Sequence, residues 1–347
     1  ITTQYPGFNT VDFQSGSTID YFKTSASAIS IQDTYNGNNI SYSKILISHA
    51  ASAGGLMAVT INNPVINSSL SIAQGSGTAG QTFTQTVTFA NTSALTIPSL
   101  TATSSNGNGT LAQNIVLGAQ PVIVTGNVSL TDAASTSTAT SCVLTINAGS
   151  LTIGGSLTVG TTGTTTPFNT PYILLNDPAS VLTVTGATTL RSLEQTNGAI
   201  KFTNSSQVVT FNGSCTTANG NSGAEVFNFN GTNATINFNN NFTDGAAGST
   251  FFVTGTEVPT INFNNGTLAV PLTSTSAGLR GSVTINGYRQ ITGSNFRTSN
   301  ASTAAYSMTI NGTLDLVANG STATNTGGGT NTLNGTGTIK LTGDYGT

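Results

Sequence analysis

The carboxylates that could catalyse a reaction are few and widely spaced in this sequence. The eleven Asp and Glu residues include Glu225 and Glu257, whose spacing would suit neighbouring units of a repeat. Glycoside hydrolysis needs two carboxyl groups within about 5–10 Å of each other. Many other pairs of positions share this spacing, and neither D-x-D nor the glycine-aspartate repeat of calcium-binding coils occurs. We therefore expect no enzyme, no catalytic residue, no metal site and no cofactor.

Three of the eight basic residues lie close together in the sequence. Arg280, Arg289 and Arg297 form the only basic concentration in a chain of formal net charge −3. They could contact an acidic glycan or a neighbouring subunit, or simply form a solvated face. Because the chain has no basic stripe, nucleic-acid binding is not expected. His49, the only histidine, follows Ser48 and has no acid beside it, so a hydrogen-bonded structural histidine is favoured over a Ser-His-Asp arrangement.

A repeated phrase shows which elements must position these side chains. The sequence T-I-N-G occurs at 284–287 and 309–312, each time within alternating apolar and polar residues that predict a strand with one buried face. We expect the Asn-Gly pairs to supply a positive φ for the turn. Looser copies run along the chain, and their turn residues fall at 63, 91, 126, 155, 186, 213, 240, 265, 287, 312 and 335.

This period predicts the fold class. The turn residues advance by about 27 residues per step, and short strands alternating with Gly, Asn and Ser turns are typical of a solenoid. Only 5% of the chain is charged, against about 25% in ordinary soluble proteins, whereas 36% is apolar and alternates. This composition excludes amphipathic helices and argues against disorder. We predict an all-β protein, a parallel β-helix (β-solenoid) of about eleven coils.

The period also indicates whether Cys142 and Cys215 could form a disulfide. They are 73 residues apart, or about three coils. Equivalent positions would then be about 14 Å apart, beyond the roughly 7 Å Cα separation that a disulfide spans. Buried free thiols are favoured, and a disulfide made through flexible loops is the alternative.

Asparagines recur through the regular part of the chain, at positions that repeat from coil to coil. Side chains that stack in register between coils can hydrogen-bond along a ladder. We predict such an inter-coil ladder, with turn and surface positions as the alternative, for Asn228, Asn230, Asn237, Asn239 and Asn262.

The segment 1–55 differs from 56–347 in composition. It holds four of the eight tyrosines, and we expect it to form aromatic-rich first coils or a cap, continuous with the solenoid of 56–347. The last strand shows no closing segment, so we expect either a longer chain or other copies of the chain stacked on this end. No signal peptide or long apolar span occurs, and membrane insertion is not expected.

Some phrases of the sequence resemble the repeats of a known protein family. The phrases Gly16-Ser17-Thr18-Ile19-Asp20-Tyr21 and Tyr42-Ser43-Lys44-Ile45-Leu46-Ile47-Ser48 resemble repeats of very large secreted surface proteins of Bacteroidota, as does the phrase at 309–316. The resemblance implies a secreted, cell-surface, adhesin-like β-solenoid, and it transfers no catalytic residue.

The sequence therefore predicts an extracellular structural or adhesive stalk or fibre segment that contacts surface glycans or copies of itself. A self-assembling subunit of an extracellular filament or sheath is the alternative within this class. The alternatives from a different class are an enzyme that acts on polysaccharides from a β-helical scaffold and a tail-fibre protein.

Overall fold

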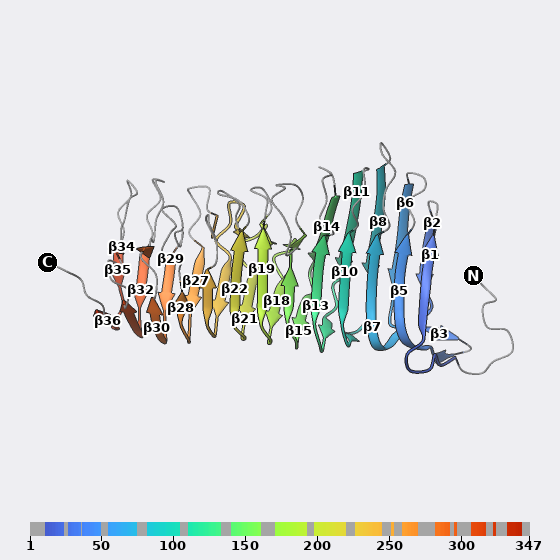
Figure 1. Cartoon of the computed structure of the whole chain (residues 1–347), viewed down its shortest axis with the longest axis horizontal. Coiled ribbons are helices and arrows are strands. Elements are labelled where there is room, and N and C mark those ends of the chain that lie inside the picture. The colour runs from blue at the N-terminus through green and yellow to red at the C-terminus, as the bar shows by residue number, and fades with distance from the viewer. Residues whose placement is uncertain are drawn as a thin grey trace.

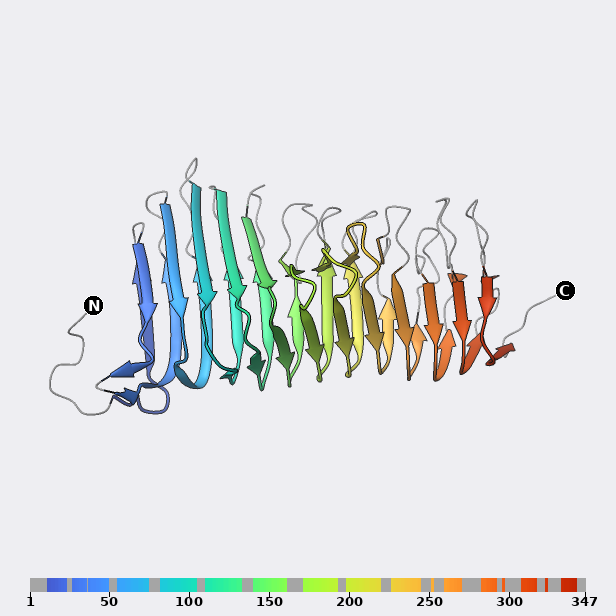
Figure 2. The same cartoon turned by 180° about the vertical axis from the view of Figure 1, so that it is seen from behind.

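The protein is a rod of stacked β-strands, seen in a computed structural model (Figure 1). The structure describes residues 11–23, 27–35, 37–49, 55–74, 82–104, 110–132, 140–160, 171–192, 198–219, 226–244, 251–252, 259–269, 282–291, 295–296, 307–316, 322–323 and 332–341. The first and the last strands lie at opposite ends of the rod, and the longest strands lie toward the N-terminal end (Figures 1 and 2). The described residues contain strands and no helix, so the all-β prediction is confirmed.

Sheet A is parallel and runs the length of the rod. Its thirteen described strands follow one another in chain order. They are β1 (Thr18–Lys23), β5 (Ser41–His49), β7 (Val65–Gln74), β10 (Leu100–Ser104), β13 (Val128–Asp132), β16 (Leu157–Val159), β19 (Thr188–Ser192), β22 (Cys215–Asn219), β25 (Phe242–Asp244), β28 (Leu268–Ala269), β30 (Tyr288–Ile291), β33 (Thr313–Leu316) and β36 (Thr338–Leu341).

Sheet B is parallel and lies on a second side of the coils. Its nine described strands are β2 (Ser27–Ile31), β6 (Gly55–Ile61), β8 (Thr82–Phe89), β11 (Thr110–Leu117), β14 (Thr140–Ile146), β17 (Tyr172–Leu175), β20 (Ile200–Lys201), β23 (Phe227–Asn228) and β26 (Phe251–Phe252). Further along, β31 (Asn295–Phe296) pairs in parallel with β34 (Thr322–Ala323).

Sheet C is parallel and forms the third side from the third coil onward. Its ten described strands are β9 (Leu95–Ile97), β12 (Val122–Val124), β15 (Ser150–Ile153), β18 (Val181–Val184), β21 (Val208–Phe211), β24 (Thr235–Phe238), β27 (Thr260–Phe263), β29 (Ser282–Ile285), β32 (Ser307–Ile310) and β35 (Thr332–Asn334). In the first coil an antiparallel hairpin of β3 (Thr34–Tyr35) and β4 (Asn38–Asn39) follows β2 instead.

The coil count differs from the expected eleven. Successive partners in sheet A lead from Ile19 to Leu341 in twelve steps of about 27 residues, so the predicted period is correct. The eleven turn residues correspond to β7 through β36 and leave out β1 and β5. Twelve spacings of about 4.8 Å give a stack about 58 Å long.

The core follows directly from the alternation in sequence. In β18, β21, β24 and β27, half-exposed and buried residues alternate, and each buried residue lies beside an apolar residue of the next coil. Phe211, Phe238 and Phe263 continue this pattern as a stack, with ring centroids 5.4 and 5.2 Å apart. The parallel ladder makes side chains of one kind meet in register, so a short sequence motif becomes a continuous column.

The N-terminal segment belongs to the same stack. β1 pairs with β5, and β2 pairs with β6, so the described part of 1–55 adds coils to sheets A and B. Tyr42 is buried there and its hydroxyl donates to the carbonyl of Gln32 at 2.8 Å. Its oxygen lies 3.0 Å from the hydroxyl of Tyr21. Tyr21 and Tyr42 therefore lie in the core of the first coils rather than on their surface.

Candidate functional site

A ladder of asparagines follows the corner where sheet C turns into sheet A. Its five members come directly after five successive strands of sheet C. Each amide Nδ2 donates to the Oδ1 of the asparagine one coil earlier, at 2.7, 2.7, 2.8 and 3.0 Å in order along the chain. We call this set the corner ladder, and it consists of Asn212, Asn239, Asn264, Asn286 and Asn311.

Main-chain hydrogen bonds between coils set the position of each asparagine in the corner ladder. The N–H of Asn264 donates to the carbonyl of Phe238 at 2.8 Å, and that of Asn239 donates to Phe211 at 2.8 Å. This parallel pairing sets one asparagine above the next at the strand spacing, a distance that a carboxamide bridges with one bond. The ladder therefore ties five coils together without using charge.

Glycines beside the ladder explain why the corner is so narrow. Gly186, Gly213, Gly287 and Gly312 follow strands of sheet C, and a Cβ at any of them would collide with main-chain atoms of the previous coil. The prediction of a positive φ is wrong for Gly287 and Gly312. It is correct for Gly335, whose φ is 104°. At most of these turns glycine is needed because two coils approach closely.

The predicted asparagine ladder is confirmed for three of its five residues. Asn262 Nδ2 donates to Asn237 Oδ1 at 2.7 Å, and Asn237 Nδ2 donates to Thr210 Oγ1 at 3.2 Å, which forms a second short ladder on the outer face of sheet C. Asn239 is part of the corner ladder.

The prediction is wrong for Asn228 and Asn230. Asn228 pairs in register with Lys201 and Phe252, so no asparagine lies beside it in the adjacent coils. Its Oδ1 instead accepts from the N–H of Asn230, which has a positive φ of 49°. Asn212, Asn264, Asn286 and Asn311 were missed, although each directly precedes one of the turn residues found in the sequence.

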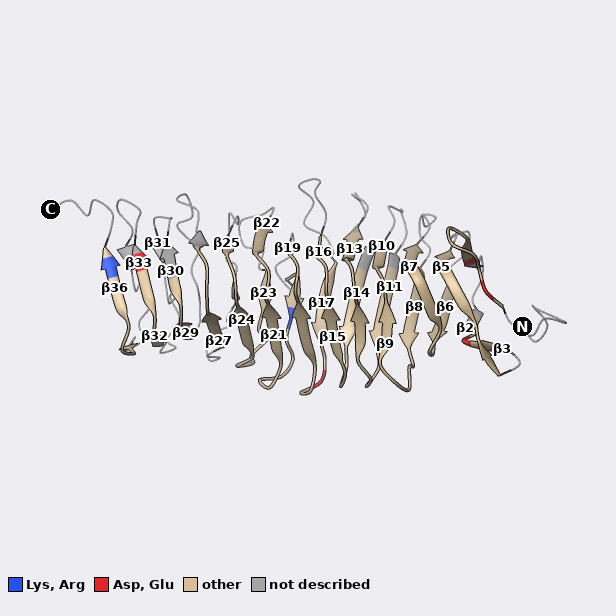
Figure 3. Ribbon diagram, turned by 90° about the horizontal axis from the view of Figure 1, so that it is seen from below, with Lys and Arg blue, Asp and Glu red and all other residues tan. Residues whose placement is uncertain are grey.

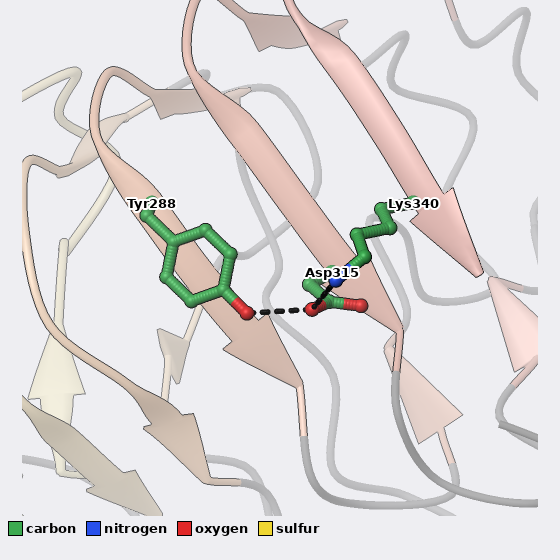
Figure 4. A network of polar contacts seen from close by, with 3 residues as sticks. All are labelled: Tyr288, Asp315 and Lys340. Carbon is green, nitrogen blue, oxygen red and sulfur yellow. Dashed lines mark hydrogen bonds and ion pairs between the residues drawn. The ribbon is translucent and has the colours of Figure 1, made fainter. Parts of the chain in front are cut away.

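A buried carboxylate forms a second polar cluster at the outer face of sheet A. Asp315 on β33 is 1% exposed and accepts a 2.5 Å hydrogen bond from Tyr288 Oη on β30 (Figure 4). Lys340 on β36 places its Nζ 3.3 Å from the same oxygen. The hydrogen bond to Asp315, assisted by the negative charge of Asp315, raises the pKa of Tyr288. Three consecutive strands are thus joined through one carboxylate.

The cysteines are free and do not form the alternative disulfide. Cys142 lies on β14 in sheet B, whereas Cys215 lies on β22 in sheet A, three coils further along. Both are buried, as the favoured prediction required. Cys142 belongs to an internal polar column, where its Sγ lies 3.1 Å from Gln113 Oε1 and Gln113 Nε2 donates to Gln85 Oε1 at 2.9 Å.

His49 is buried, but it is not the hydrogen-bonded histidine that was expected. It is 2% exposed at the end of β5 and stacks on Phe83. Neither ring nitrogen has a hydrogen-bond partner among the residues described. Burial lowers the pKa of His49, because a charged imidazolium would lose its water there.

The remaining predicted sites are not described. Arg280 and Arg297 lie outside the described residues, as do Glu225 and Glu257, and the side chain of Arg289 on β30 lies outside them too. Their predicted roles stay predictions. Charged side chains are sparse over the described ribbon (Figure 3). No group of three or more His, Cys, Asp or Glu side chains suited to a metal is found in the described ranges, and no helix there could span a membrane.

The fold and its ladders define the chain as a parallel β-solenoid with an uncharged, hydrogen-bonded corner. Comparison with protein-family models, with curated proteins and with solved structures found no match.

Proposed function

We propose that this chain is a stiff structural segment of an extracellular stalk or fibre. The observation that carries the proposal is the continuity of the ladders. Sheet A pairs thirteen strands in chain order, and the corner ladder adds side-chain bonds over five coils. A force along the rod must break a whole rung of hydrogen bonds at once. Stiffness therefore comes from the repeat itself.

The outer surface supports an extracellular setting. Outward positions of sheet A carry a hydroxyl in seven successive coils, namely Ser71, Thr101, Ser129, Thr158, Thr189, Thr216 and Thr243. Thr101 Oγ1 donates to Ser71 Oγ at 2.9 Å, so neighbouring hydroxyls also bind each other. Such a neutral, close-paired surface offers few charged side chains and few free main-chain groups to a protease.

Electron microscopy of the native material, with no substrate added, tests this proposal first. Gold-labelled antibodies against the chain should mark straight surface fibres or rods on unbroken cells of the source organism. Labelling that appears only after the cells are lysed would contradict an extracellular role. Long uniform fibres would favour a filament subunit, whereas isolated rods would favour a segment of a longer stalk.

An enzymatic role is tested on the same preparation. The proposal predicts that incubation with neutral and acidic polysaccharides releases no reducing ends. Release that disappears in the Glu225→Gln or Glu257→Gln variant would instead support the polysaccharide-acting alternative.

A further inference from the structure

A cleft opens on the side of the rod where sheet C begins. In the third coil, ten residues connect β8 to β10 and include β9. In the second coil, only three residues connect β6 to β7. This short connection contains no strand, so β9 is the edge of sheet C among the described strands. The gap exists because this connection is seven residues shorter in the second coil than in the third.

The cleft has a volume of about 650 Å³ and is lined by three coils. We call it the β9 cleft. The β3–β4 hairpin contributes Asp33, Thr34 and Asn39, the short connection contributes Asn63, and the edge strand contributes Thr96. This volume lies within the range of about 300–1,000 Å³ that is usual for small-ligand sites.

Free polar groups line the β9 cleft. The side chains of Asp33, Asn39 and Thr96 have no hydrogen-bond or ion-pair partner among the described residues. In β9 the N–H of Leu95 and the carbonyl of Ile97 bind the neighbouring coil, at 3.0 and 2.9 Å. Because adjacent residues of a strand direct their main-chain groups to opposite sides, the N–H and carbonyl of Thr96 face the open edge. The cleft therefore offers both donors and acceptors.

The other lining residues limit what can bind. Val65 is 39% exposed, and it lies beside Pro64 and Ala94 in the lining. No Lys, Arg or His occurs among the described residues that line the cleft, while Asp33 carries a negative charge there. An anionic ligand would be repelled by this carboxylate, whereas hydroxyl groups can donate to it. The aliphatic side chains suit the C–H face of a sugar ring.

We propose that the β9 cleft binds a neutral oligosaccharide, with Asp33 and Asn39 holding its hydroxyl groups and Val65 contacting a ring face. The proposal uses none of the three arginines named above, and it does not depend on the mechanical role of the rod. The carboxylate, amide and hydroxyl groups in the lining can accept hydrogen bonds from sugar hydroxyls or donate to them, and the open edge of β9 offers one further main-chain donor and one acceptor.

Calorimetric titration of the whole chain tests the proposal. The probes are cellotriose, laminaritriose, mannotriose and chitotriose, and the acidic counterpart is trigalacturonic acid. We expect at least one neutral trisaccharide to bind at millimolar concentration or below, and trigalacturonic acid to bind more weakly. The Asp33→Ala variant should weaken binding by about tenfold or more, because a hydrogen bond to a charged group is lost.

Two further variants separate a lost site from a lost fold. Ala94→Phe adds a ring at an exposed lining position and should block binding while the circular dichroism spectrum stays unchanged. Asp20→Ala removes a carboxylate from the outer face of sheet A, away from the cleft, and should bind like the unmodified chain. Absence of binding to every neutral probe would overturn the proposal. Unchanged binding in both Asp33→Ala and Ala94→Phe would overturn it as well.

Discussion

An asparagine side chain can hydrogen-bond in both directions along a rod, because a carboxamide carries a donor and an acceptor. Asn264 uses both, donating to Asn239 and accepting from Asn286. Threonine, which also lines the outer faces, has only one rotating hydroxyl for the same task. The corner ladder therefore adds a continuous chain of polar bonds along the corner where neighbouring coils approach closely.

The first residue-scale prediction concerns Asn264. The Asn264→Ala variant should lose about 1–2 kcal/mol in the free energy of unfolding, because two partly exposed hydrogen bonds are broken. Chemical denaturation measures this change. Asn265→Ala is the matched control. Among the described residues, the Asn265 side chain accepts one local bond, from the N–H of Gly266 in its own turn, so this variant should lose less stability. Equal losses in the two variants would show that the ladder adds nothing to stability.

A second residue-scale prediction concerns His49 and pH. The pKa of His49 is lowered in the folded state, so below about pH 6.5 the unfolded chain binds a proton that the folded chain does not. Stability should therefore fall as the pH is reduced from 7.5 to 5.5, by up to about 1.4 kcal/mol per pH unit. The His49→Phe variant keeps an aromatic ring against Phe83 and should lack this part of the pH dependence. Denaturation curves of both proteins with the same pH slope would contradict the prediction.

At the scale of the element, the turn between sheets C and A depends on glycine for closeness rather than for backbone freedom. A Cβ on Gly186 would lie 2.5 Å from the carbonyl carbon and oxygen of Gly155. The N–H of Gly186 also donates to that oxygen at 3.0 Å, so the two coils cannot separate without losing a bond.

The Gly186→Ala variant should consequently be destabilised by about 1–3 kcal/mol, the usual cost of overpacking. Thr185→Ala, at the exposed neighbouring position, should change stability by less than about 0.5 kcal/mol. Thermal or chemical denaturation compares the two. A Gly186→Ala variant as stable as the unmodified chain would mean that the corner can relax.

At the scale of the whole molecule, each coil contacts mainly its two neighbours, so the rod should tolerate the loss of one complete coil. Leu182 pairs in register with Val209, and deletion of residues 182–208 joins Val181 to Val209 without changing the inward and outward faces. The shortened chain should keep its β spectrum and become about 4.8 Å shorter by small-angle scattering. Deletion of 182–194 instead removes part of a coil and should abolish folding. Folding of both deletions, or of neither, would contradict this prediction.

The sequence by itself determined the fold class, the period of about 27 residues and the existence of an asparagine ladder. Strict alternation and repeated turn residues specify a strand and a corner locally, and a parallel stack converts each local motif into a column. The inter-coil bonds of Asn237, Asn239 and Asn262 could be predicted for this reason.

Only the tertiary structure decided which asparagines meet, because register depends on the length of every connection in each coil. Asn228 pairs in register with Lys201 and Phe252. Asn264, in contrast, hydrogen-bonds to asparagines in both adjacent coils. The residue type alone does not distinguish these two positions. The β9 cleft has the same origin. It is lined by residues of three coils, and it forms because the connection in the second coil is too short to hold a strand. A local sequence motif can indicate a strand, but it cannot indicate that a neighbouring coil lacks one.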